Sequence, residues 1–151
     1  MLYLKSVIDP HISYCCTIWG HATQTHLAPL INLQQRCIKT CFSLDLKHFS
    51  PDLCIKTNLL LLPDKLSYYL AQIPHKFFYD SDSLPAYFTS LFHEITLSHS
   101  HATRQSTNGL FIPQANTNLR KASVAYHGPL LWNQIPSEIR NITTIILFKK
   151  R

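Results

Sequence analysis

The chain has 151 residues, which suits one domain with a core of moderate size. Hydrophobic residues make up 46% and charged residues 15%, a balance that excludes a disordered, charge-rich tail. The longest uncharged apolar run, residues 59–62, is too short to span a bilayer, and no secretory signal is visible at the N-terminus. We therefore expect a soluble, intracellular protein with no membrane partner, and leave nucleus or cytoplasm open.

The net charge of +6 is distributed unevenly along the chain. Residues 1–101 contain as many acidic as basic residues, so the whole net charge lies in residues 102–151, where Glu138 is the only acid. Such asymmetry favours a polyanionic partner, RNA or DNA, although an ordinary basic surface is the alternative. The candidate nucleic-acid-binding residues are Arg104, Arg120, Lys121, Arg140, Lys149, Lys150 and Arg151.

Proline positions indicate where helices begin. Proline is favoured in the first helical turn, where its missing N–H costs nothing, and an acid nearby suits the helix dipole. Four such sites predict helix starts near residues 10, 51, 63 and 136, with Asp9 and Ser50 as N-caps of the first two. In chain order, we expect one helix over residues 11–19, and a second that is capped by Thr23 or Thr25.

The next segments continue the helical pattern. Residues 27–42 are the most clearly amphipathic stretch, and residues 66–77 carry another apolar stripe. Pro74 lies inside that stripe and cannot donate to the carbonyl of Leu70, so we expect a kink or break there. A brief helix is expected over residues 51–58, a polar turn at 80–83 and a short helix from 84.

The last third is predicted to be partly irregular. Residues 93–109 are polar and lack an apolar period, which predicts a mobile loop. Residues 110–113 can form one short strand. Residues 123–126 are expected to be helical, but could instead pair with that strand. A final helix is expected from Thr143 or Thr144 through Lys150. The predicted fold is mainly α: a compact multi-helix single domain over 1–151 with at most one small β-hairpin, comprising a helical region over residues 1–92, the loop and a basic region over residues 110–151.

The most informative stretch is residues 126–136, Tyr-His-Gly-Pro-Leu-Leu-Trp-Asn-Gln-Ile-Pro. Trp is large, and its indole N–H needs a partner once it is buried, so Trp132 is expected to anchor the C-terminal third. We take the structural anchors to be Trp19, Gly128, Pro129, Trp132 and Pro136.

This stretch and the residues after it resemble the pattern Y-x-G-P-x-x-W-N-x-x-P-x-x-I-R, then F-K-K, in the far C-terminal tail of LINE-type, non-LTR retrotransposon reverse transcriptases of animals. Residues 3–20 look like the helix pair in the thumb that follows the polymerase core of that family. Further matches come in the family's order, namely L-x-x-L-Q at 30–34, L-x-x-L-P-x-x at 59–65, L-P-x-Y-F at 84–88 and H-x-T-R at 101–104. The resemblance covers nearly the whole chain.

The departures from that family decide the expected activity. Its members are RNA-directed DNA polymerases that hold two metal ions with a Tyr-x-Asp-Asp motif and a further Asp, and this sequence contains no such motif. No Gly-x-Ser-x-Gly elbow or Gly-rich phosphate loop is present either. We expect no enzyme activity, no cofactor and no small-molecule substrate. The chain resembles a truncated copy, a tail without its polymerase.

One metal-ligand pattern is present in the first half. It consists of Cys37, Cys41, His48 and Cys54, which are separated by three, six and five residues. Three cysteines and a histidine are a ligand set that suits tetrahedral zinc. Because Cys37 and Cys41 fall on the expected amphipathic helix, we favour buried thiols over zinc. The histidines at 93, 99 and 101 are expected to be solvated.

Two functions follow as hypotheses. The preferred one is a non-catalytic C-terminal fragment of a retrotransposon reverse transcriptase that retains at best weak, non-specific RNA or DNA binding. The alternative is a relic or protein-interaction module whose apolar surface packs on the missing polymerase core. The seven basic residues discriminate between the two, because one contiguous face favours nucleic acid and scattered positions favour the interaction module.

Overall fold

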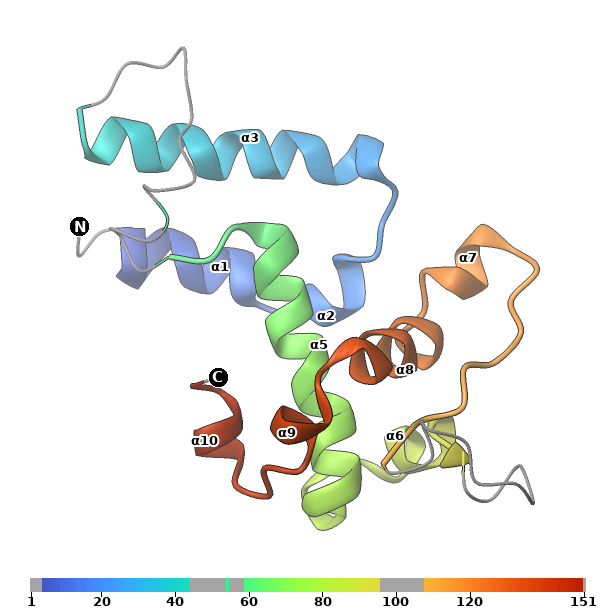
Figure 1. The fold of residues 1–151 in the computed structure, drawn as a ribbon. Helices are drawn as coiled ribbons and strands as arrows, with labels where there is room; N and C mark the ends of the chain where they lie inside the picture. Colours follow the sequence, from blue (N-terminus) through green and yellow to red (C-terminus); the bar gives the residue numbers. More distant parts are fainter. Residues whose placement is uncertain (1–3, 44–53, 55–58, 96–107, 151) are drawn as a thin grey trace. The chain divides into compact units, whose positions relative to one another are not determined.

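The computed structural model describes residues 4–43, 54, 59–95 and 108–150. Helix accounts for 69% and strand for 2%, and no β-sheet forms within these ranges (Figure 1). The prediction of a mainly α fold is therefore confirmed. The chain divides into two compact units, Met1–Leu66 and Ser67–Arg151, here unit 1 and unit 2. The single domain over 1–151 stays a prediction.

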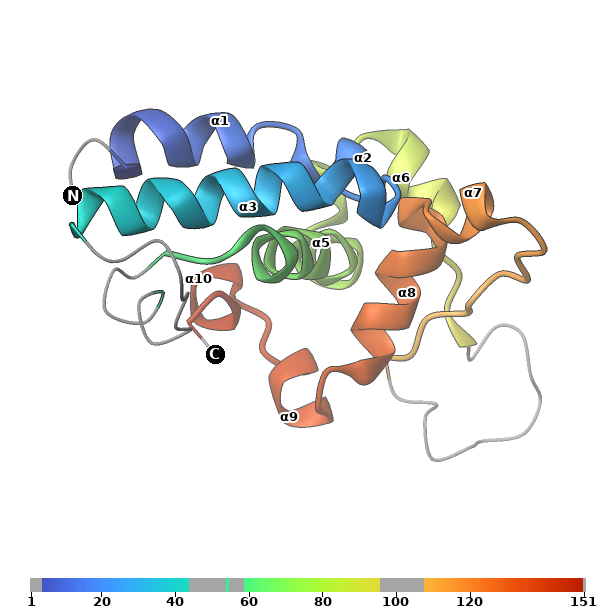
Figure 2. The same ribbon diagram turned by 90° about the horizontal axis from the view of Figure 1, so that it is seen from above.

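Unit 1 consists of short N-terminal helices and one long helix. A π-helix at Leu4–Ile8 leads directly into α1 at Asp9–Ser13, and α2 follows at Cys16–Trp19. The long helix α3 spans Gln24–Cys41 and lies alongside α1 in both views (Figures 1 and 2). It begins directly after Thr23, one of the two predicted caps, although the Thr23 side chain makes no capping hydrogen bond.

The prediction of one helix over residues 11–19 is wrong, because the chain leaves helical geometry at Tyr14 and Cys15. Cys15 has a φ of 49°, in the left-handed region. In a continuous helix the Tyr14 carbonyl would accept from the Ile18 amide. Here it accepts from Nε1 of Trp19 at 2.8 Å. The indole thus replaces a helical hydrogen bond across the break.

The core of unit 1 contains a buried glutamine beside apolar side chains. Gln34 is 3% exposed; its Nε2 donates to the Leu60 carbonyl and its Oε1 accepts from the Leu62 amide, both at 2.9 Å. These bonds hold the segment that enters α5, Leu62–Tyr79, against α3. Around them lies the apolar cluster of Leu4, Ile38 and Leu59 with Ile8, Cys37 and Leu61.

Lys65 is also buried in unit 1, at 4% side-chain exposure. Its ammonium forms an ion pair with the Asp9 carboxylate and donates to Oγ of Ser13 at 3.0 Å. Oγ of Ser13 donates in turn to the Asp9 carbonyl at 2.6 Å. Asp9, which we expected to be an N-cap, lies instead in the first turn of α1 and makes no capping bond. Its carboxylate compensates the buried charge of Lys65.

Unit 2 contains the rest of α5 and a series of shorter helices. They are the 3-10 helix Ser81–Ser83, α6 Ala86–Leu91, α7 Asn118–Lys121, α8 Val124–Gln134, α9 Ser137–Arg140 and α10 Ile145–Phe148. The beginnings of α5 and α9 agree with the predicted starts at 63 and 136. The start at 51 falls outside the described residues.

Pro74 does not break α5, which is continuous to Tyr79. A proline inside a helix costs about 3 kcal/mol, because it removes one backbone hydrogen bond and its ring clashes with the preceding turn. Pro74 is fully buried, and residues on either side of it, Ala71 and Phe78, pack in the core of unit 2. Burial of both halves of the helix offsets the missing bond, so the expected break does not occur.

The core of unit 2 is centred on Trp132, which is 0% exposed. Its ring stacks on Phe78 at a centroid distance of 5.6 Å, and its Nε1 donates to the Asn108 carbonyl at 2.8 Å. Gly128, one turn earlier on α8, is buried against Phe92, where an added Cβ would lie 3.0 Å from the ring. Even an alanine there would require the Phe92 ring to shift by a few tenths of an ångström.

The chain around Leu110 forms one isolated antiparallel bridge, with Glu94. Asn133 secures it, because its Nδ2 donates to the Leu110 carbonyl at 2.8 Å and its Oδ1 accepts from the Leu110 amide at 3.0 Å. The predicted strand over 110–113 is therefore limited to this bridge. Pairing with residues 123–126 does not occur, since α8 begins at Val124. Most of the predicted loop, residues 96–107, lies outside the described residues.

Candidate functional site

The structure describes five of the seven candidate nucleic-acid-binding residues, and these five lie in two kinds of environment. Arg104 and Arg151 lie outside the described residues. Arg140 is buried, its Nη1 donating to the Asn108 carbonyl at 3.3 Å while its own carbonyl accepts from the Tyr79 hydroxyl at 2.9 Å. Its guanidinium thus holds α9 in place inside unit 2. The remaining four are exposed, namely Arg120, Lys121, Lys149 and Lys150.

These four cations form two separate pairs. Arg120 and Lys121 end α7, whereas Lys149 and Lys150 follow α10. Both views show α7 and α10 at opposite ends of unit 2, with α5 and α8 between them (Figures 1 and 2). These four cations therefore do not make one contiguous face.

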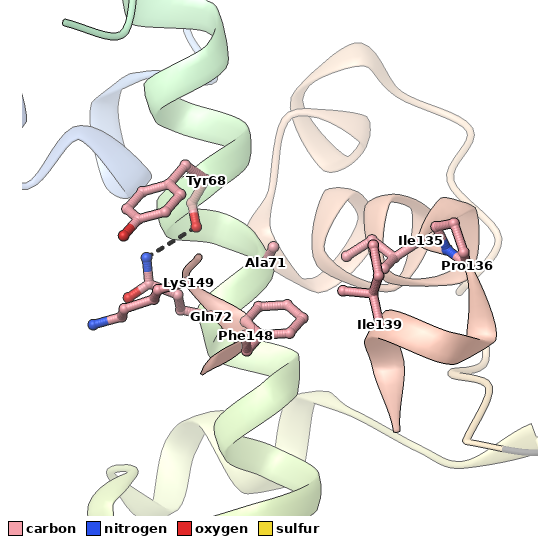
Figure 3. A pocket seen from close by; sticks show the side chains of 8 residues that line it. All are labelled: Tyr68, Ala71, Gln72, Ile135, Pro136, Ile139, Phe148 and Lys149. Carbon is pink, nitrogen blue, oxygen red and sulfur yellow. Dashed lines mark hydrogen bonds between the residues drawn. The ribbon is translucent and has the colours of Figure 1, made fainter. Parts of the chain in front are cut away.

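A pocket of about 250 Å³ opens in unit 2 between α5, the turn before α9, and α10 (Figure 3). Ile135 and Ile139 form one side, facing Ala71 of α5 and Phe148 of α10. The polar side chains gather at the other end. The full lining is Tyr68, Ala71, Gln72, Ile135, Pro136, Ile139, Phe148 and Lys149.

An aromatic cluster fixes the Phe148 wall of this pocket. The Phe148 ring lies 4.5 Å from the ring of His75 and 5.9 Å from that of Trp132, centroid to centroid. His75 is 1% exposed, and its Nε2 donates to the Ile142 carbonyl at 2.7 Å. Burial lowers the pKa of His75, against the opposing effects of that hydrogen bond and of Asp80, so the ring is neutral at neutral pH.

Three of the four candidate metal ligands lie in the part of the chain that the structure describes, and it does not bring them together. Cys37 is half-buried against the core of unit 1, Cys41 is exposed at the end of α3, and both are free thiols. His48 lies outside the described residues. Cys54 is a half-buried thiol whose pKa is raised by burial and by Asp64. Among the described residues, no group of three His, Cys, Asp or Glu could hold a metal ion.

The predicted anchors divide between core and surface. Trp132, Gly128 and Pro129 are buried in unit 2. Trp19 is half-buried and ends α2, so it stabilises the break at Tyr14–Cys15 rather than a core. Pro136 is exposed, directly precedes α9 and lines the pocket.

Sequence reasoning missed the polar residues that join distant segments within each unit. Asn108 has a φ of 54°, and its carbonyl accepts from both Trp132 and Arg140. An Asn followed by Gly is a signal for the left-handed region, which Asn tolerates better than most residues. Gln34, His75 and Asn133 carry no comparable local signal, because their partners lie 23 to 67 residues away in the chain.

No helix in the described ranges is both long and apolar enough to cross a membrane. Comparisons with protein-family models, with curated proteins and with solved structures gave no match to this chain.

Proposed function

We propose that the chain is a non-catalytic C-terminal segment of a LINE-type reverse transcriptase that acts through protein contact. The ordered sequence patterns support the assignment to that family. The role in protein contact rests on one observation, the separation of the exposed cations of α7 from those that follow α10. A nucleic-acid strand that tracks a basic groove would need those charges along one path.

Apolar exposure in unit 2 supports protein contact as well. Ile146 and Leu147 of α10 are 63% and 55% exposed, and the apolar pocket opens beside the same helix. Exposed apolar patches on a protein surface are typical of interaction sites. The partner that fits the sequence resemblance is the polymerase core of that family.

The test is complex formation with that core. The polymerase core of an animal LINE reverse transcriptase, purified without its own tail, is mixed with the chain and analysed by size-exclusion chromatography and calorimetry. We expect a one-to-one complex that persists at high salt, because an apolar interface is little screened. Neither the chain alone nor buffer-matched controls should extend a primer on an RNA template. The absence of any complex would overturn the proposal.

Weak, non-specific RNA or DNA binding is the second candidate, favoured by the concentration of the whole net charge in residues 102–151. Fluorescence anisotropy with single-stranded RNA at several salt concentrations would measure it. Three or four phosphate contacts predict a slope of log affinity against log salt of about −2 to −4, and a Kd of roughly 10⁻⁴ to 10⁻⁶ M. Replacing Lys149, Lys150 and Arg151 by Ala should reduce that slope. Replacing Arg120 and Lys121 is the control for the other end of unit 2.

A further inference from the structure

Two walls of the pocket in unit 2 are fixed by ring packing and by hydrogen bonds. Phe148 is 8% exposed and packs on His75 and Trp132. On the opposite side, the position of α9 is fixed by the hydrogen bonds of Arg140 to Asn108 and Tyr79. The pocket therefore exists before anything enters it, which lowers the cost of binding.

Its lining combines an apolar interior with one charge. Ala71, Ile135, Pro136, Ile139 and Phe148 contribute the interior. The polar end is formed by Tyr68, Gln72 and Lys149 (Figure 3).

The side-chain amide of Gln72 donates a hydrogen bond to the Tyr68 carbonyl on the same helix, at 3.0 Å. Lys149 is exposed, and none of the described acids forms an ion pair with it. A ligand therefore meets an apolar cavity with a solvated cation at its rim, and Lys150 follows directly.

The volume indicates what kind of apolar group enters. Sites for drug-sized molecules usually measure about 300–1,000 Å³. A pocket of about 250 Å³ lies below that range and fits one or two bulky side chains of a protein segment. From this size and the charge at the rim, we propose that the pocket receives an apolar anchor side chain from an acidic segment of a partner protein. This inference rests on the proposed function, whose partner surface it specifies.

Charge argues against α10 of a second copy of the chain as the occupant. In residues 110–150 Glu138 is the only acid, and the apolar residues of α10 precede Lys149 and Lys150. Inserting α10 of one copy into the pocket of another would therefore bring like charges together at the rim. Such juxtaposition is destabilising at an interface, whereas Asp or Glu beside the anchor would be attracted.

The experiment uses the full chain and a short fluorescein-labelled peptide in which Leu and Phe are flanked by Asp and Glu. Two matched peptides replace either the Leu and Phe by Ser or the acids by their amides. Burial of one Leu or Phe side chain predicts that the Ser peptide binds roughly 10- to 100-fold more weakly. The amide peptide should bind more weakly than the acidic one, and only at low salt should the difference be large.

Two protein variants locate the contact. Lys149→Glu reverses the rim charge at an exposed position and should weaken the acidic peptide roughly 3- to 10-fold. Lys121→Glu makes the same change in net charge on α7, at the other end of unit 2, and should have less than about a twofold effect. Gln72→Trp fills the pocket and should abolish the advantage of the Leu and Phe peptide; its circular dichroism melting curve checks the fold.

The outcomes separate this inference from the proposed function. Equal effects of Lys149→Glu and Lys121→Glu, or equal binding of the Ser peptide, would overturn the pocket proposal. Binding of decanoate, blocked by Gln72→Trp, without binding of the peptide would assign the pocket to a small amphipathic acid and overturn it too. Complex formation with the polymerase core that Gln72→Trp and Lys149→Glu leave unchanged would support the function and refute the pocket. Peptide binding that depends on the pocket, without formation of that complex, would support the pocket proposal and refute the proposed function.

Discussion

Trp132 and Asn133 are adjacent in the sequence and hold the same short segment by different means. The indole is buried in the core and donates to the Asn108 carbonyl at 2.8 Å. The amide of Asn133 satisfies both backbone groups of Leu110, which is itself 0% exposed. An apolar anchor thus stabilises the segment, and a neighbouring polar side chain sets its register.

Replacing Trp132 by Ala should destabilise the protein by about 3–5 kcal/mol, since a buried Trp leaves a large cavity. Urea denaturation followed by circular dichroism measures the change in unfolding free energy. Leu119→Ala is the control, because Leu119 is 86% exposed and surface substitutions usually stay within about 0.5 kcal/mol. A loss below about 1 kcal/mol for Trp132→Ala would contradict its place at the centre of the core.

Asn133→Ala removes both bonds to Leu110 and leaves a buried amide and carbonyl without partners. The expected loss is about 1–3 kcal/mol, the desolvation cost of an unsatisfied buried group. Asn133→Asp retains an acceptor for the Leu110 amide but cannot donate to the carbonyl, so it should also destabilise. If Asn133→Ala matched the wild type in thermal denaturation, the clamp would contribute nothing to stability.

His75 should make the protein less stable in acid. Its folded-state pKa is lowered by burial, so the folded protein favours the neutral ring and the unfolded chain takes up the proton first. The stabilisation is complete above the unfolded value of about 6.5 and is lost as the pH falls through it towards the folded value. Denaturation at about pH 7.5 and pH 5 should show a smaller loss in His75→Gln, which can still donate to Ile142.

His127 is the matched control for that measurement, because burial lowers its pKa too. His127→Gln should therefore remove only its own share of the pH dependence. Identical pH profiles for the wild type and His75→Gln would show that His75 is not protonated on unfolding in this range.

At the scale of elements, the ion pair between Lys65 and Asp9 joins the first turn of α5 to α1. Asp9→Asn would leave a buried ammonium without its counter-charge and should cost about 2–3 kcal/mol. Replacing both, Asp9→Leu with Lys65→Met, removes the two charges together and should cost less than Asp9→Asn alone. A double variant less stable than Asp9→Asn in urea denaturation would show that the pair itself, and not the uncompensated charge, matters.

Helix positions were predictable where a local signal exists. Proline with a nearby acid marked the beginnings of α5 and α9, and the apolar period marked α3. The break at Cys15 was not predictable, because no local sequence signal marks a left-handed conformation at a cysteine. The continuity of α5 through Pro74 depends likewise on packing by residues distant in the sequence.

For the candidate site too, local features were predictable and features that depend on distant residues were not. Composition indicated which residues are basic, but only the fold shows that Arg140 is buried and that α7 and α10 lie apart. The pocket was not predictable at all, since it requires Tyr68, Ile135 and Phe148 to meet from three separate segments of the chain. Local patterns thus predicted helices, and the spatial grouping of side chains came from the tertiary structure.

At the scale of the whole molecule, the two tryptophans provide one intrinsic fluorophore for each compact unit. Trp19 belongs to unit 1 and is half-buried, whereas Trp132 belongs to unit 2 and is shielded from water. Emission from Trp132, measured in Trp19→Phe, should therefore lie at shorter wavelength than emission from Trp19, measured in Trp132→Phe. If the chain is one cooperative domain, denaturant transitions recorded by the remaining tryptophan and by circular dichroism should coincide within each variant. Two separate transitions, one read by each tryptophan, would mean that the chain unfolds in two steps and that each step can be followed without an added label.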